Sequence, residues 1–92
     1  MVNRIIFRDI RHSCLYIEYK NKNNQWHRKN GPARIWGDDS EEWYYNGRCH
    51  RLDGPAISYF AGQDKEWYYN DEKIHCHSQE EFERLIKLRL LW

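Results

Sequence analysis

The feature that most constrains this chain is an internal repeat of 23 to 24 residues. The segment His27–Ala33 (His-Arg-Lys-Asn-Gly-Pro-Ala) recurs 23 positions later as His50–Ala56 (His-Arg-Leu-Asp-Gly-Pro-Ala). The segment Glu42–Asn46 (Glu-Trp-Tyr-Tyr-Asn) recurs unchanged 24 positions later as Glu66–Asn70. Repeats of this length build folds in which each unit packs on its neighbours, so an array of short, similar units is predicted.

Each unit is predicted to contain two short strands. One strand follows the Gly-Pro pair, at residues 33–36 and 56–60, and an aromatic strand follows a polar turn, at residues 41–46 and 65–70. Asn46-Gly47 is a hairpin signal, because both residues accept the positive φ of a tight two-residue turn. The predicted fold is therefore mainly β (β+α), an antiparallel sheet of consecutive hairpins with one C-terminal α-helix.

The first part of the chain is predicted to add two strands. Residues 4–8 and 15–19 are rich in apolar residues, and in the second run Leu15, Ile17 and Tyr19 alternate with other side chains. We interpret these strands as a degenerate first unit that caps the array.

The C-terminal part changes to a helical pattern. Ser78 followed three residues later by Glu81 matches a capping box, and apolar residues then recur at helical spacing, which predicts a helix from Gln79 to Leu91. We expect this helix to pack on one face or end of the sheet. An alternative is a homodimer formed through Leu88, Leu91 and Trp92.

The length predicts a single domain over residues 1–92. Its expected parts are N-terminal strands (1–26), a first repeat (27–49), a second repeat (50–77) and the helix (78–92).

Composition narrows the class of protein. A net charge of +1 argues against a dedicated duplex-DNA binder, which carries a large excess of cations. The mean hydropathy of −1.08 would suit a disordered chain, but 16% aromatic residues indicate a folded one. An odd number of cysteines (three) and the lack of a long apolar stretch favour a cytoplasmic protein without membrane contact.

The pattern Glu-Trp-Tyr-Tyr-Asn-Gly-x-x-His-x-x-x-Gly-Pro-Ala resembles the MORN repeat over about residues 26 to 77. The matching residues are Trp43, Asn46, Gly47, His50, Gly54, Trp67, Asn70 and His75. The likeness is greater to a variant with His-Arg-x-Asp-Gly-Pro-Ala, met mostly in phage and giant-virus proteins. Two departures are Arg51, where a small residue is usual, and Asp71, in place of the second Asn-Gly glycine. The resemblance implies an extended antiparallel sheet used for protein interaction, sometimes discussed for lipids, without a conserved active site.

Paired histidines and arginines suggest a catalytic alternative. His27 with Arg28, and His50 with Arg51, could act as general base and oxyanion stabiliser. A residue that recurs in every unit more often serves the unit's own geometry, through a turn hydrogen bond or packing on the aromatic strand. We therefore predict no catalytic residue and no enzymatic activity.

A zinc site is a second chemical alternative. It would require Cys49, His50, His75 and His77 to converge, with Cys76 nearby. The spacing matches no familiar zinc motif. We predict no metal and no cofactor.

The aromatic strands point to an interaction surface. Because side chains alternate along a strand, Trp43, Tyr45, Trp67 and Tyr69 are predicted to form a cross-strand ladder under the helix, leaving Tyr44 and Tyr68 exposed on the opposite face. The predicted partner-binding residues are Trp36, Tyr44, Arg48, Tyr59 and Tyr68.

These observations favour a non-enzymatic protein-interaction module. Given the resemblance, the concrete form expected is a small phage accessory protein that binds and inhibits a host protein in the host cytoplasm, such as an anti-defence or anti-CRISPR inhibitor. The alternative is binding of nucleic acid or glycan by stacking on Tyr44 and Tyr68, with Arg34, Arg48, Arg51 and Lys65 nearby.

Overall fold

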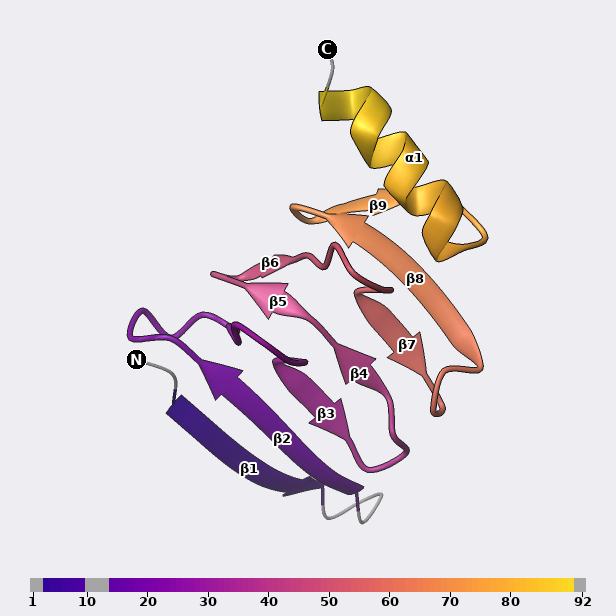
Figure 1. Cartoon of the computed structure of the whole chain (residues 1–92). Coiled ribbons are helices and arrows are strands. Elements are labelled where there is room, and N and C mark those ends of the chain that lie inside the picture. Colours follow the sequence, from indigo (N-terminus) through magenta and orange to yellow (C-terminus); the bar gives the residue numbers. More distant parts are fainter. Residues whose placement is uncertain (1–2, 10–13, 91–92) are drawn as a thin grey trace.

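The protein is an open antiparallel sheet with one helix at its C-terminal end, as the computed structural model in Figure 1 shows. The structure describes the backbone of residues 3–9 and 14–90 and the side chains of residues 17–90. Its principal extents are 45 × 31 × 17 Å, so the molecule is a slab. Among the described residues, a second layer is present only at the helix end, and the rest of the sheet is a single layer (Figure 1).

Seven strands form the main sheet in the order β1-β2-β3-β4-β7-β8-β9, and β5 and β6 form a separate two-stranded ribbon. All neighbouring strands are antiparallel. The elements are β1 Asn3–Asp9, β2 Cys14–Lys20, β3 Arg34–Trp36, β4 Glu41–Glu42, β5 Tyr44–Tyr45, β6 Arg48–Cys49, β7 Ile57–Tyr59, β8 Asp64–Tyr69, β9 Glu72–Ile74 and α1 Gln79–Leu90. The predicted fold class is confirmed, and so are the two N-terminal strands.

The first aromatic strand is interrupted at Trp43, where the sequence predicts one continuous strand. The Trp43 N–H donates to the carbonyl of Ala56 at 2.7 Å, while its carbonyl accepts from the His50 N–H at 3.2 Å. The Trp43 backbone therefore hydrogen-bonds to two separate segments of the chain. β4 pairs within the main sheet, and β5 leaves it to pair with β6.

Both aromatic strands end in tight turns with positive φ, as Asn46-Gly47 predicted. The φ angles are 49° and 82° at Asn46 and Gly47, and 46° and 74° at Asn70 and Asp71. The Asp71 carboxylate also accepts a hydrogen bond from the Cys49 N–H at 3.2 Å. This contact between units offsets the strain of a non-glycine residue at that position.

We count the N-terminal strands as the first unit, so that Tyr19, Trp43 and Trp67 mark the first, second and third units. An arginine holds each of the first two units together. In the second unit, the Arg51 guanidinium lies 3.8 Å from the centre of the Trp43 ring and donates to the carbonyl of Pro55 at 3.2 Å. A Cβ on Gly54 would lie 2.6 Å from the Arg51 Cζ, so only glycine leaves room for the guanidinium. We call this arrangement, an arginine between an aromatic ring and a glycine, the arginine clasp.

The first unit contains the same clasp, which identifies it as a true repeat. The Arg28 guanidinium lies 4.2 Å from the centre of the Tyr19 ring and donates to the carbonyl of Pro32 at 3.2 Å. A Cβ on Gly31 would lie 2.7 Å from the Arg28 Cζ. Tyr19 thus takes the place of Trp43, 24 positions earlier. The N-terminal strands belong to the array.

The third unit has no clasp, and the helix takes its place. Trp67, at the position of Trp43, is buried with Ile74 of β9 and Phe82 and Ile86 of α1. Its indole N–H donates to the Gln79 side-chain oxygen at 2.8 Å. This small cluster is the apolar core of the helix end.

The predicted aromatic ladder under the helix is only half correct. Trp67 is buried in the helix cluster and Tyr69 packs beside it. Trp43 lies under Arg51 instead, and Tyr45 is 46% exposed. A helix of 12 residues spans only about 18 Å, so it cannot reach back across the sheet.

The helix begins where the sequence predicts. The Glu81 N–H donates to the Ser78 hydroxyl at 3.1 Å, so Ser78 is the N-cap. The Glu81 carboxylate accepts from the His77 N–H at 2.7 Å, one residue before the N-cap. Leu88 and Leu90 are exposed, whereas Leu91 and Trp92 of the predicted dimer contact lie outside the described residues.

The clasp predicts a strong coupling between Gly54 and Arg51. Gly54→Ala should displace the guanidinium and lower the free energy of unfolding by about 1–2 kcal/mol, because the ring contact and a hydrogen bond are lost. In an Arg51→Ala background the same change should be neutral or stabilising by up to about 1 kcal/mol, since the φ of Gly54 suits alanine.

Urea unfolding of the two single variants, the double variant and the unmodified protein measures this coupling. Equal effects of Gly54→Ala in both backgrounds would contradict the clasp.

Candidate functional site

The strand register places one row of side chains on a single sheet face. Glu18 lies opposite Arg34, which lies opposite Glu42. Glu42 lies opposite Ile57, and Ile57 opposite Glu66. Because directly paired residues of antiparallel strands share a face, this row crosses β2, β3, β4, β7 and β8.

Aromatic side chains flank this row and complete a surface that we call the open face. It consists of Glu18, Trp26, Arg34, Trp36, Glu42, Tyr44, Ile57, Tyr59, Glu66 and Tyr68. The helix core cluster forms on Trp67, which alternates with Glu66 and Tyr68 along β8 and so points to the opposite face. The open face therefore has no helix over it.

Glu42 organises the middle of the open face. Its carboxylate accepts hydrogen bonds from the Arg34 guanidinium at 3.0 Å, the Trp36 indole at 3.1 Å and the Tyr44 hydroxyl at 3.2 Å. The Arg34 guanidinium also lies 4.0 Å from the centre of the Trp26 ring. The network neutralises these partly buried charges and fixes the aromatic rings in place.

A glutamate paired with a cation recurs along the array at a spacing of 24 residues. Glu18 is 5% exposed and accepts from the Trp26 indole at 2.9 Å, with Lys20 at 3.3 Å. Glu66 pairs with Lys73 at 3.4 Å. The sequence interpretation missed these glutamates, although the spacing of Glu18, Glu42 and Glu66 was the available signal.

Four of the five predicted partner-binding residues lie on the open face. They are Trp36, Tyr44, Tyr59 and Tyr68. Arg48 does not join them, because it pairs with Tyr45, whose side chain points to the opposite face from that of Tyr44. Arg48 is exposed at the rim of the ribbon.

Tyr44 and Tyr68 are half-buried, whereas the sequence predicts that they are exposed. The Tyr44 ring lies 5.0 Å from that of Trp26, and burial and then the Glu42 charge hold the pKa of Tyr44 far above its usual value. Burial and the nearby Glu66 likewise raise the pKa of Tyr68. Both rings are therefore only partly accessible to a partner.

The repeated histidines form turn hydrogen bonds, as predicted from their recurrence. The Asn46 N–H donates to the His27 Nδ1 at 2.9 Å, and the Asn70 N–H donates to the His50 Nδ1 at 3.0 Å. Each imidazole thereby fixes the hairpin turn of the next unit. Accepting at Nδ1 requires the tautomer protonated at Nε2, and burial lowers the pKa of His50.

Of the three cysteines, Cys49 and Cys76 have described side chains, and both are free thiols. Cys49 is 4% exposed, and burial, with smaller effects from Asp71 and Glu42, raises the pKa of its thiol to about 12. Cys76 packs against the helix cluster. Among the residues whose placement is described, no three His, Cys, Asp or Glu side chains gather in a way that could hold a metal ion.

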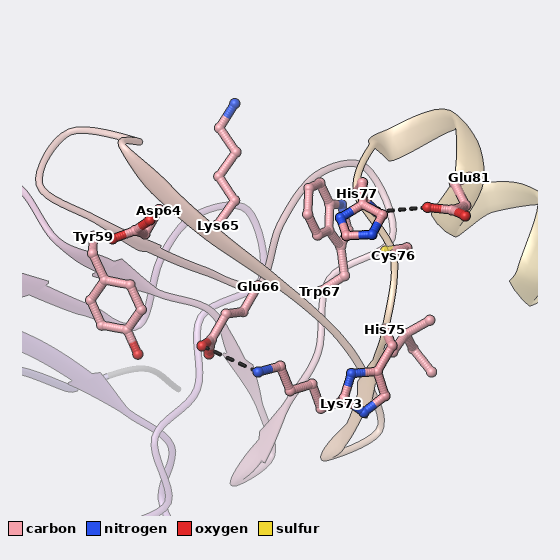
Figure 2. A pocket seen from close by; sticks show the side chains of 11 residues that line it. Tyr59, Asp64, Lys65, Glu66, Trp67, Lys73, His75, Cys76, His77 and Glu81 are labelled. Atoms are coloured by element: carbon pink, nitrogen blue, oxygen red, sulfur yellow. Dashed lines mark hydrogen bonds and ion pairs between the residues drawn. The ribbon is translucent and has the colours of Figure 1, made fainter.

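A groove of about 430 Å³ lies beside β8 and β9, near the start of the helix (Figure 2). Its lining includes Lys65 and Glu66 of β8, Lys73 of β9, and the segment His75–His77. The Glu66–Lys73 ion pair spans one side of it, and Lys65 extends away from the groove (Figure 2). The groove is predominantly polar.

The comparisons with known proteins give no relative: no family model matches the sequence, and no curated protein or solved structure is significantly similar to it. Within the described residues, α1 is too short and too polar to cross a membrane.

The histidine turns predict a pH dependence of stability. The pKa of His50 is lower in the folded protein than in the unfolded chain, where it is near 6.5, so the unfolded chain binds a proton first. The contribution of His50 to the free energy of unfolding should therefore be at its maximum above about pH 7 and should decrease as the pH drops through about 6.5.

His50→Asn is the matched control, because an asparagine side-chain oxygen can accept in place of Nδ1 without titrating. Unfolding measured from about pH 7.5 to 5 should show a shallower loss in the variant. Parallel curves would contradict this role of His50.

Burial predicts that Cys49 resists alkylation. At about pH 8, iodoacetamide should modify Cys76 faster than Cys49 in the folded protein, because a thiol with a pKa near 12 holds almost no thiolate. Peptide mass spectrometry separates the two sites, and unfolding in guanidinium chloride should equalise them. Equal rates in the folded protein would contradict the burial of Cys49.

Proposed function

We propose that the protein is a non-enzymatic interaction module that binds a partner protein on the open face. The observation that carries this proposal is a sheet face of partly exposed aromatic rings, of which Trp26, Trp36 and Tyr44 already donate hydrogen bonds to glutamates of that face. Rings fixed in this way lose little freedom on binding, and these donors stay paired when a partner removes water. Tyr, Trp and Arg dominate the binding energy of protein interfaces.

The contacts of three arginines, Arg34 on the open face and Arg28 and Arg51 on the opposite face, favour a protein surface over a polyanion as the partner. Arg34 is bonded to Glu42, and Arg28 and Arg51 are held in their clasps on carbonyl oxygens. These cations are committed to internal partners, whereas nucleic-acid binding needs cations free to contact phosphates. Nucleic acid or glycan binding is therefore the second candidate.

Binding of this kind would inhibit the partner by covering its functional surface. The slab offers a broad, flat contact. A phage-encoded inhibitor of a host defence protein, acting in the host cytoplasm, is the form that the repeat resemblance favours. Self-association through the exposed side of the helix stays open.

Two tyrosines of the open face can be compared with one on the opposite face. Tyr59→Ser and Tyr68→Ser each remove an open-face ring outside the Glu42 network. Tyr45→Ser removes an exposed ring on the opposite face and is the matched control. We expect each open-face change to weaken partner binding by about tenfold or more, and the control to change it less than about threefold.

The measurement is recovery of a nuclease-resistant partner from host lysate, followed by titration of that purified partner. Nuclease-sensitive recovery would favour the stacking alternative. Equal loss with Tyr45→Ser would contradict the assignment of the open face.

A further inference from the structure

The repeat shows what normally lies against the outer edge of each aromatic strand. In the first unit the Tyr19 N–H donates to the carbonyl of Ala33 at 2.8 Å, and β3 continues along β2. In the second unit the Trp43 N–H donates to the carbonyl of Ala56 at 2.7 Å, and β7 continues along β4. Each unit thus receives a Gly-Pro-Ala strand from the unit that follows.

Among the residues that the structure describes, no such strand pairs with the third unit. After β9 the chain turns at Ser78 into the helix, with no further Gly-Pro-Ala segment. β9 covers β8 only from Trp67 to Tyr69. Residues Asp64–Glu66 pair with β7 on the inner side, and no described strand pairs with their outer side. Figure 1 shows this half of β8 at the margin of the sheet.

Repeat equivalence identifies the backbone groups left at this edge. Lys65 stands 24 positions after Glu41, whose partner in β7 is Ser58. The backbone N–H and carbonyl of Lys65 should therefore point outward, in the place where Glu41 meets the following strand. The 430 Å³ groove lies along this edge and is lined by Asp64, Lys65 and Glu66.

The row of glutamates indicates the chemistry of a missing strand. Glu18 lies opposite Arg34 of the following strand, β3, whereas Glu42 receives the Arg34 guanidinium and the Trp36 indole from the preceding strand and lies opposite Ile57 of the following one. Glu66 has Ile57 on its inner side and a longer contact with Lys73, at 3.4 Å. A guanidinium on the outer side would complete its charge pairing.

We propose that the outer edge of β8 at Asp64–Glu66 binds an extended segment of the partner protein, which adds a strand to the sheet and places an arginine against Glu66 and an aromatic residue two positions further on. Main-chain hydrogen bonds to Lys65 supply affinity, and Glu66 supplies selection for the basic residue. This inference deepens the proposed function and rests on it.

The chain contains a model of this segment, since Asn30–Gly37 (Asn-Gly-Pro-Ala-Arg-Ile-Trp-Gly) fills the equivalent place against β2. A labelled synthetic peptide of this sequence should bind the full chain saturably in fluorescence polarisation. In amide NMR spectra, the shifts should concentrate on Asp64–Trp67.

Three matched changes test the geometry. Replacing the peptide isoleucine by its N-methyl form removes a main-chain donor and should weaken binding by about tenfold or more. Replacing the peptide arginine by glutamate, or Glu66→Gln in the protein, should weaken it by about fivefold or more. Tyr45→Ser should change it less than about threefold, because that exposed ring lies on the β5–β6 ribbon and does not line the groove.

Absence of saturable binding, indifference to the N-methyl group, or shifts confined to β1 would overturn the inference. Concentration-dependent self-association that the peptide abolishes would assign the edge to a second copy and overturn a separate partner. The tyrosine variants of the open face are tested by their binding to the partner itself. A failure of the peptide to bind would therefore contradict this inference without contradicting the proposed function.

Discussion

The contact on which the array depends is an arginine held between an aromatic ring and a glycine. In each of the first two units the guanidinium stacks on Tyr19 or Trp43 and bonds the carbonyl after a glycine. A single-layer sheet cannot bury large side chains on both faces, so its units need another source of cohesion. The clasp supplies it by combining cation–π attraction, a hydrogen bond and close backbone approach. The third unit uses helix packing instead.

The open face is also a consequence of the single-layer sheet. With no second sheet above it, the row of glutamates is shielded by the aromatic rings that it binds. Glu42 holds three donors, and the rings around it are fixed but remain open on one side. A surface that is rigid, aromatic and internally neutralised suits contact with another protein. The incomplete third unit then offers a second kind of contact, a backbone edge that the repeat itself leaves unfilled.

Much of the local structure could be predicted from the sequence, because it depends on neighbours in the chain. The Asn46-Gly47 turn follows from the positive φ that these residues accept, and the helix start follows from Ser78. The histidines could be assigned to turn geometry because they recur with the unit. The exposure of Tyr44 could not be predicted, because Trp26, which covers its ring, precedes it by 18 residues and is brought beside it by strand pairing.

The sequence by itself determined the units, their turns, the helix and the class of fold, since these arise from periodicity and local backbone preference. Only the tertiary structure decided which side chains share a face, and so separated Arg48 from the aromatic residues with which it was grouped. It also decided that Arg51 stacks on Trp43 and that the helix covers only the last unit. Register and packing are set by contacts between units, and a pattern read along one strand does not contain them.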